Sequence, residues 1–223
     1  MANRINIMQG SMKSWREDEI NIAHMVERCK VLGPGERAVL WVQGCPRRCP
    51  GCHNPEFAPF IDAEWISVNE LFNRIVSIKN IEGITISGGE PFMQSHALAK
   101  LAHMIKDTGL SVMVYSGFTL EELKSGIVPY AGELLGTIDL LIDGSFMKEL
   151  PTSKLWRGSD NQRLIGLSDK YREYINIWNS PIGQQFEIRL LGKGKIEFLG
   201  IPPSEINSIQ TLNNIKKDKE NRS

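Results

Sequence analysis

Short apolar runs alternate with amphipathic segments through the middle of the chain. The runs have the length and the β-branched content of buried strands; they lie at residues 38–43, 84–86, 110–115 and 138–142. The segments between them carry apolar residues three and four positions apart, as on one face of a helix; they begin at Ser67, Ser95 and Thr119. Strands that alternate with amphipathic helices predict a parallel α/β sheet with right-handed crossovers.

Local signals sharpen these boundaries. Ser67 with Glu70 and Thr119 with Glu122 have the spacing of helix-capping boxes, and Gly109 ends a helix predicted over residues 95–107. Residues 20–32 contain strand-like stretches before a Gly-Pro-Gly turn. Residues 144–166 are rich in loop formers, and residues 186–199 predict a hairpin that turns at residues 192–194.

The chain of 223 residues is long enough for one domain with a substantial core. We expect this domain over residues 19–203. Residues 1–18 lack periodicity and predict a flexible N-terminal extension, and residues 204–223 predict a polar C-terminal tail.

Charge and hydropathy exclude several classes of function. The 26 basic and 26 acidic residues balance, so no nucleic-acid partner and no membrane surface is indicated. We find neither a run of eighteen apolar residues nor a signal peptide. With three of its four cysteines in one short run, the chain is unlike a secreted disulfide scaffold, and we expect a reducing cytoplasm.

The most specific chemistry lies directly after the first of the central strands. Cys45, Cys49 and Cys52 form a C-x3-C-x2-C run at a strand-to-loop junction. Clustered thiolates bind zinc or iron–sulfur clusters. Three of them suggest a 4Fe-4S cluster with one open iron. A fourth ligand, Cys29 or His53, would instead make a closed zinc or electron-transfer site.

Three other segments follow strands that we expect to be parallel. They are Gly88-Gly89-Glu90-Pro91, Tyr115-Ser116-Gly117 and Asp143. Ligands bind where parallel strands end, so these segments are expected to lie together with the cysteine run. The glycines can allow close backbone approach to a ligand or serve turn geometry alone, and Asp143 can contact a ligand or cap a turn.

The cysteine run and the Gly-Gly-Glu-Pro segment resemble the radical S-adenosylmethionine (SAM) superfamily. The stretch from Gly51 to Glu56 is similar to the activating proteins of anaerobic (class III) ribonucleotide reductase. Further stretches resemble the same family; they are residues 33–37, 115–123, 138–144 and 157–163. Gly51 departs from the superfamily, in which an aromatic residue often precedes the third cysteine.

The resemblance implies a trimmed radical SAM βα barrel with parallel strands and a C-terminal hairpin. It implies that Cys45, Cys49 and Cys52 are catalytic and hold a 4Fe-4S cluster, whose open iron binds SAM. The residues it assigns to cofactor binding are Gly51, Cys52, His53, Gly88, Gly89, Glu90, Tyr115, Ser116 and Asp143.

The activity that the resemblance implies is the reductive cleavage of SAM to a 5′-deoxyadenosyl radical. That radical would place a glycyl radical on a large partner enzyme, the anaerobic ribonucleotide reductase, with flavodoxin or ferredoxin as electron donor. Two alternatives stay open. The target can be another glycyl radical enzyme, a peptide or a metabolite, or the chain can be a non-enzymatic iron–sulfur or zinc module. The segment from Arg157 to Gln162 is either a hydrogen-bonded surface turn or a loop that docks a partner.

Overall fold

The computed structural model describes residues 16–191 and 195–201. The strands in this part of the chain are β1 (Glu19–Cys29), β2 (Arg37–Val42), β3 (Glu64–Ser67), β4 (Gly83–Gly88), β5 (Ser111–Tyr115), β6 (Leu140–Asp143), β7 (Arg163–Gly166), β8 (Phe186–Leu191) and β9 (Lys195–Gly200). The α-helices are α2 (Val68–Val76), α3 (Ser95–Asp107), α4 (Leu120–Lys124), α5 (Ala131–Leu135) and α6 (Ile175–Trp178). Single turns of 3-10 helix occur at η2 (Pro55–Phe57), η3 (Pro91–Gln94) and η4 (Asp169–Tyr171).

Seven strands form one sheet in the order β3-β1-β2-β4-β5-β6-β7. The four strands β2, β4, β5 and β6 run parallel, which confirms the predicted α/β pattern at the centre of the sheet. The flanking strands differ from that prediction, because β1, β3 and β7 are antiparallel to their neighbours. The link from β1 to β2, residues 30–36, is too short for the crossover that a parallel pair needs.

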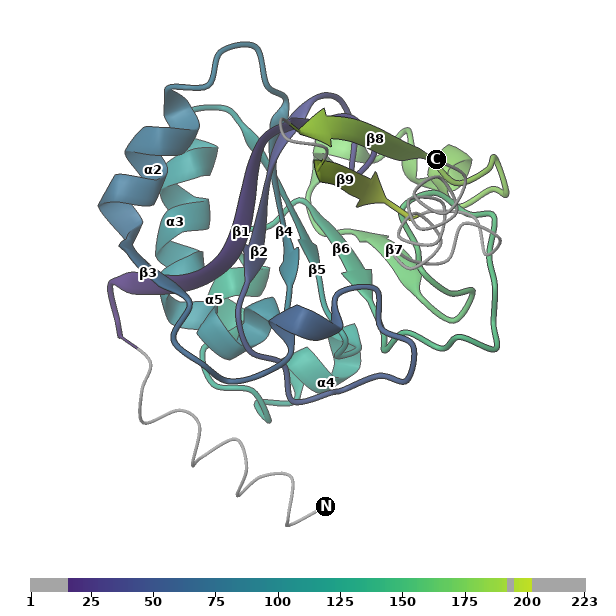
Figure 1. The fold of residues 1–223 in the computed structure, drawn as a ribbon, viewed down its shortest axis with the longest axis horizontal. Helices are drawn as coiled ribbons and strands as arrows, with labels where there is room; N and C mark the ends of the chain where they lie inside the picture. The colour runs from purple at the N-terminus through teal and green to yellow at the C-terminus, as the bar shows by residue number, and fades with distance from the viewer. Residues whose placement is uncertain (1–15, 192–194, 202–223) are drawn as a thin grey trace, which may run out of the picture.

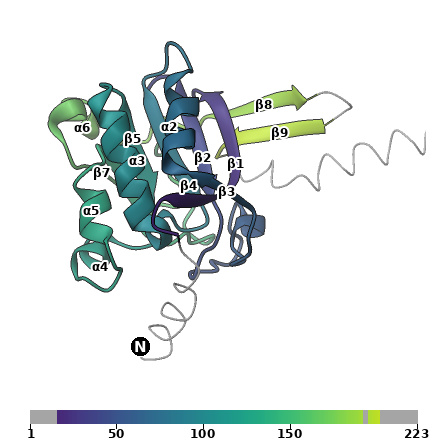
Figure 2. The same ribbon diagram turned by 90° about the vertical axis from the view of Figure 1, so that its left-hand side faces the viewer.

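Helices α2, α3 and α5 cover one face of this sheet (Figures 1 and 2). The buried stripe of α3 includes Leu98, Leu101 and Ile105, which join the apolar side chains of the parallel strands in the main core. Ser67 caps α2 by accepting a hydrogen bond from the Glu70 N–H at 3.1 Å. The predicted helices at Ser67 and Ser95 are thus confirmed. The first ends at Val76, so the predicted face residue Ile78 lies beyond it.

The opposite face of the sheet carries two smaller apolar clusters. One contains Cys29, Trp41 and Leu199, and the other contains Met113 and Trp156; Tyr115 packs against both. The β8–β9 hairpin lies on this side (Figure 1) and confirms the predicted hairpin, although its turn at residues 192–194 lies outside the described residues.

The predicted extension and tail fall largely outside the described part of the chain. Residues 1–15 of the expected 1–18 extension, and all of the expected tail at 204–223, are not described. Among residues 16–191 and 195–201, no helix has the length and hydropathy needed to cross a bilayer.

Candidate functional site

The cysteine run forms a loop at the carboxyl end of β2. Backbone hydrogen bonds hold both of its ends: Cys45 N–H donates to Ala58 O at 2.9 Å, and Cys52 N–H donates to Cys49 O at 3.1 Å. Gly51 has a φ of 72°, a left-handed conformation that favours glycine, which explains the glycine before the third cysteine. All three thiols are unpaired and partly exposed.

Burial disfavours the thiolate form of Cys45 and of Cys52. Burial, with a smaller effect from the Glu90 carboxylate, raises the pKa of Cys45 to about 11. Burial likewise raises the pKa of Cys52. The backbone N–H groups of Arg47 and Arg48 near Cys45, and of Asn54 near Cys52, lower these pKa values, but by less than burial raises them.

Cys29 lies far from this loop. It is buried on β1 and pairs with Arg37 at the start of β2, whereas Cys45 follows the other end of β2. Within residues 16–191 and 195–201, no three His, Cys, Asp or Glu side chains are grouped closely enough to hold one metal ion.

The parallel strands bring the other predicted segments to the same edge. Gly88 pairs with Val42, and the N–H groups of Gly89 and Glu90 donate to Val42 O at 2.7 Å and Gly44 O at 2.8 Å. The Gly88–Glu90 turn is thereby fixed against the start of the cysteine loop.

Both glycines of this turn are required by the protein's own packing. A Cβ on Gly88, whose φ is 102°, would lie 2.4 Å from Val42 N. A Cβ on Gly89 would lie 2.3 Å from Gly44 O. The backbone that these glycines approach closely is that of β2 and the cysteine loop, as the turn-geometry alternative expects.

The Glu90 side chain joins the β4 turn to the β5 turn. It is buried, and it accepts hydrogen bonds from Ser116 Oγ at 2.9 Å, from Gly117 N–H at 2.7 Å and from Phe92 N–H at 3.1 Å. Burial raises the pKa of Glu90 to about 7, although these donors work in the other direction. The sequence did not indicate this role, because the contact joins residues 26 and 27 positions apart.

Tyr115 and Ser116 lie at this edge as predicted. The Tyr115 hydroxyl is buried with no hydrogen-bond partner among the residues described, and burial raises its pKa. The Ser116 hydroxyl donates to Glu90 and accepts a hydrogen bond from Phe118 N–H at 3.0 Å. The Ser116 side chain therefore stabilises the turn after β5 and links it to Glu90.

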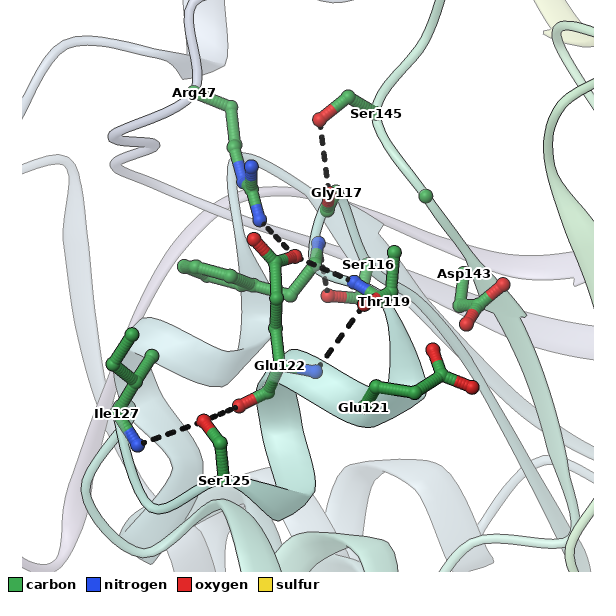
Figure 3. A network of polar contacts seen from close by, with 12 residues as sticks. Arg47, Ser116, Gly117, Thr119, Glu121, Glu122, Ser125, Ile127, Asp143 and Ser145 are labelled. Atoms are coloured by element: carbon green, nitrogen blue, oxygen red, sulfur yellow. Dashed lines mark hydrogen bonds and ion pairs between the residues drawn. The ribbon is translucent and has the colours of Figure 1, made fainter. Parts of the chain in front are cut away.

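Both oxygens of the Asp143 carboxylate accept hydrogen bonds from the protein itself. They accept from Leu120 N–H at 2.7 Å and from Arg163, whose Nε lies 2.9 Å from Oδ1. Arg163 also pairs with Glu121 at 2.7 Å. These contacts favour the capping alternative for Asp143, at the first turn of α4 (Figure 3).

His53 packs against a residue that the sequence analysis did not single out. Its ring lies 4.7 Å from the Phe146 ring, centroid to centroid, at 48°. The residue is exposed, yet enough protein surrounds the ring to lower the pKa of His53 by desolvation. His53 and Phe146 together offer an aromatic surface beside the third cysteine.

The loop from Arg157 to Gln162 has a structural explanation. Arg157 is buried and donates to Asn179 Oδ1 at 2.7 Å. Gln162 accepts from Gly158 N–H at 2.7 Å and donates to Gly144 O at 2.9 Å. This part of the chain is held by hydrogen bonds, as the first alternative expected, but Arg157 and Ser159 are buried, so it is not a surface turn.

Arg47 is a further residue that spacing did not reveal. It lies between the first two cysteines, and its Nη2 is 2.5 Å from Glu122 Oε2 in α4 (Figure 3). Glu122 also completes the predicted capping box with Thr119, which is confirmed. The cysteine loop is therefore tied to α4.

Comparisons with known proteins agree with this site. A family model described as a 4Fe-4S single cluster domain matches residues 31–165, more than half of the chain. The anaerobic ribonucleoside-triphosphate reductase-activating protein of Enterobacteria phage T4 is 35% identical over 146 residues, covering 62% of this chain and 89% of the phage protein. The protein of the same name from Escherichia coli (strain K12) is 35% identical over 144 residues, covering 59% and 89%.

A second kind of relative matches a shorter stretch. The pyruvate formate-lyase-activating enzyme of Staphylococcus aureus (strain USA300) is 37% identical over 94 residues, covering 39% of this chain and 38% of that enzyme. The matches define an iron–sulfur protein with a 4Fe-4S domain. The chain belongs to the family of radical SAM activating proteins that includes the anaerobic ribonucleoside-triphosphate reductase-activating proteins.

Proposed function

We propose that this protein uses a 4Fe-4S cluster and SAM to generate a glycyl radical on a partner enzyme. The observation that carries the proposal is the loop of three unpaired thiols at the carboxyl edge of the parallel strands. The donor set fits the cluster, because Cys45, Cys49 and Cys52 supply three thiolates and Cys29 lies at the other end of β2. One iron is then left for SAM.

The fold is compatible with a trimmed radical SAM βα barrel. In this proposal the four parallel strands with helices on one face would form part of such a barrel, with antiparallel strands on either side of them. An incomplete barrel leaves an open side, which suits a protein substrate better than a small one.

A cluster held by Cys45, Cys49 and Cys52 would supply, when bound and reduced, the electron for cleavage of SAM, and the radical so formed would take a hydrogen atom from a glycine Cα of the partner. The protein's own residues bind and orient SAM. The SAM ammonium is a donor. The Gly88–Glu90 turn would therefore receive it at carbonyl oxygens, since the N–H groups of Gly89 and Glu90 already donate to β2 and Gly44.

The nucleoside would lie on the aromatic surface of His53 and Phe146, with Gly51 and Cys52 at its edge. The unpartnered hydroxyl of Tyr115 is a further candidate contact. Ser116, the Glu90 side chain and Asp143 are positioning residues in this proposal, because their polar atoms hold the turns together.

The partner we propose is an anaerobic ribonucleotide reductase, with flavodoxin or ferredoxin as electron donor. Support comes from relatives named for that reductase, which match over 89% of their length. A pyruvate formate-lyase-type glycyl radical enzyme is the second candidate. It is favoured by the shorter match to the Staphylococcus aureus enzyme.

The test is anaerobic reconstitution followed by three measurements. Iron and sulfide content should show a cluster, addition of SAM and reductant should give 5′-deoxyadenosine, and mixing with the organism's own reductase should give a glycyl doublet in electron paramagnetic resonance. The control is the reductase with its radical glycine replaced by alanine. Cleavage of SAM without a radical on the reductase would transfer the assignment to the second candidate. Absence of a cluster would refute the proposal as a whole.

A further inference from the structure

The two faces of the β8–β9 hairpin differ in polarity. Successive residues of a strand point to opposite faces, and directly opposed residues on paired strands share one face. The register therefore places a set of apolar side chains together on one face; they are Phe186, Ile188, Leu190, Ile196 and Phe198. We call this the apolar face of the hairpin. The opposite face carries the charged side chains of the hairpin, together with Leu191 and Leu199.

The charged face is the one that lies against the rest of the protein. Its side chains contact β1 and the residue after it; the pairs are Glu187 with Lys30 N–H at 2.7 Å, Arg189 with Arg28 O, and Glu197 with His24 at 2.8 Å. Leu199 is buried in the apolar cluster that contains Cys29. These contacts hold one face of the hairpin on β1, so the apolar face points away from β1.

The apolar face is open to solvent in the described part of the chain. The exposed fractions of Leu190 and Ile188 are 83% and 54%. The other members of this face are partly exposed, and none of them belongs to an apolar core cluster of the described residues. Figure 2 shows the hairpin extending away from the large sheet. A two-stranded hairpin is marginally stable by itself, and a contiguous exposed apolar patch marks a contact surface. We therefore expect this face to be covered.

The chain itself continues from the base of the hairpin. The N–H of Ile201 donates to Gln185 O at 3.3 Å, so the C-terminal segment begins beside the start of β8. Residues 202–223 lie outside the described part of the chain, and their composition predicted a polar tail. Their sequence nevertheless places apolar residues three positions apart; they are Ile206, Ile209, Leu212 and Ile215. Ser204 follows two prolines and is a common N-cap, so the pattern predicts a helix with one apolar side.

We propose that residues 204–216 bind the apolar face of the hairpin through the four apolar residues of this segment. The lengths agree, because a helix over these residues is about 20 Å long. Each hairpin strand has six residues and also spans about 20 Å. The segment is joined directly to β9, and a short connection gives an effective concentration on the order of millimolar. This favours the protein's own segment over a second copy or another protein.

The proposal concerns a part of the chain that the family resemblance leaves unassigned. The hairpin and the C-terminal segment both lie beyond residues 31–165, the stretch that matches the 4Fe-4S family model. The contact needs no bound cluster and no partner enzyme. Its failure would therefore leave the proposed function untouched.

Hydrogen–deuterium exchange of the full-length protein, followed by mass spectrometry, tests the contact. Leu212→Asp places a charge among the apolar residues of the segment. We expect the amides of residues 186–200 to exchange about tenfold faster in this variant, because an uncovered hairpin opens more often. The matched control is Asn214→Asp, which adds the same charge on the opposite side of the predicted helix and should leave the exchange unchanged. Circular dichroism checks that each variant is folded.

A photoreactive p-benzoylphenylalanine in place of Leu190 identifies what covers the apolar face. We expect cross-links to residues 204–216 of the same chain. Cross-links between isotopically labelled and unlabelled chains would overturn the inference in favour of a second copy. Cross-links that form only after addition of the anaerobic ribonucleotide reductase would overturn it in favour of that partner. The absence of any cross-link to residues 204–216, or equal hairpin exchange in Leu212→Asp and Asn214→Asp, would also overturn it.

Discussion

Replacing Glu90 by glutamine should change how stability depends on pH. Burial raises the pKa of this carboxyl from 4.5 to about 7 in the folded protein. Between these values the folded state keeps the proton and the unfolded state releases it. The unfolded state then binds fewer protons, so stability falls as pH rises from about 4.5 to about 7. At about 1.36 kcal/mol for each pH unit, the total loss is about 3 kcal/mol.

Glu90→Gln removes this ionisation. It also disturbs one of the hydrogen bonds from Phe92, Ser116 and Gly117, because glutamine has a single acceptor oxygen. The cost of the lost hydrogen bond does not vary with pH, so the slope of the free energy of unfolding against pH reports the ionisation alone. Urea unfolding of the cluster-free protein at pH 5, 6, 7 and 8 gives the free energy of unfolding for both proteins. We expect the variant to gain up to about 3 kcal/mol relative to wild type across this range.

Glu173→Gln, at an exposed position, is the control; its free energy of unfolding should depend on pH in the same way as that of the wild type. If the difference between wild type and Glu90→Gln is constant from pH 5 to pH 8, the carboxyl is ionised throughout. The reasoning from burial would then be wrong.

Two further predictions concern the cysteine loop. Replacing Cys45, Cys49 or Cys52 by alanine should abolish the cluster, whereas Cys29→Ala should keep it. Iron content, sulfide content and visible absorbance measure the cluster. Loss of the cluster in Cys29→Ala would favour a four-ligand site. Gly89→Ala should destabilise the protein and disturb the cluster as well as SAM binding, because the new Cβ would lie 2.3 Å from Gly44 O. Gly132→Ala is the control for thermal unfolding, because nothing lies within 4 Å of its new Cβ. Equal unfolding temperatures for the Gly89 and Gly132 variants would contradict the predicted clash.

The elements that the sequence predicted are those with a strong local signal. The central strands are apolar runs, and the helices at Ser67, Ser95 and Thr119 have either a capping residue or a long apolar stripe. The elements it missed are short. β3, β7 and α6 have four residues each and α5 has five, which is too few for a periodic pattern; β7 lies in the stretch 144–166 that was expected to be loop.

The same distinction applies to the site. The cysteine spacing is local and could be recognised, and the parallel strands then place the Gly88–Glu90 turn beside it. The ties that hold the site join distant residues: Arg47 and Glu122 are 75 positions apart, and Glu90 and Gly117 are 27 apart. No spacing rule reports such contacts. The sequence suggested that Gly88 and Gly89 let the backbone approach a ligand. The structure shows that a side chain at either position would clash with the backbone of β2 or of the cysteine loop.

The two outermost strands of the large sheet affect the protein's behaviour in solution. β3 and β7 are only four residues long, and each carries a charge, Glu64 on β3 and Arg163 on β7. Short, charged edge strands are poor templates for pairing with another chain. A sheet that does not close on itself otherwise exposes unpaired backbone groups at both margins. Short, charged strands at both ends of the sheet therefore limit edge-to-edge aggregation.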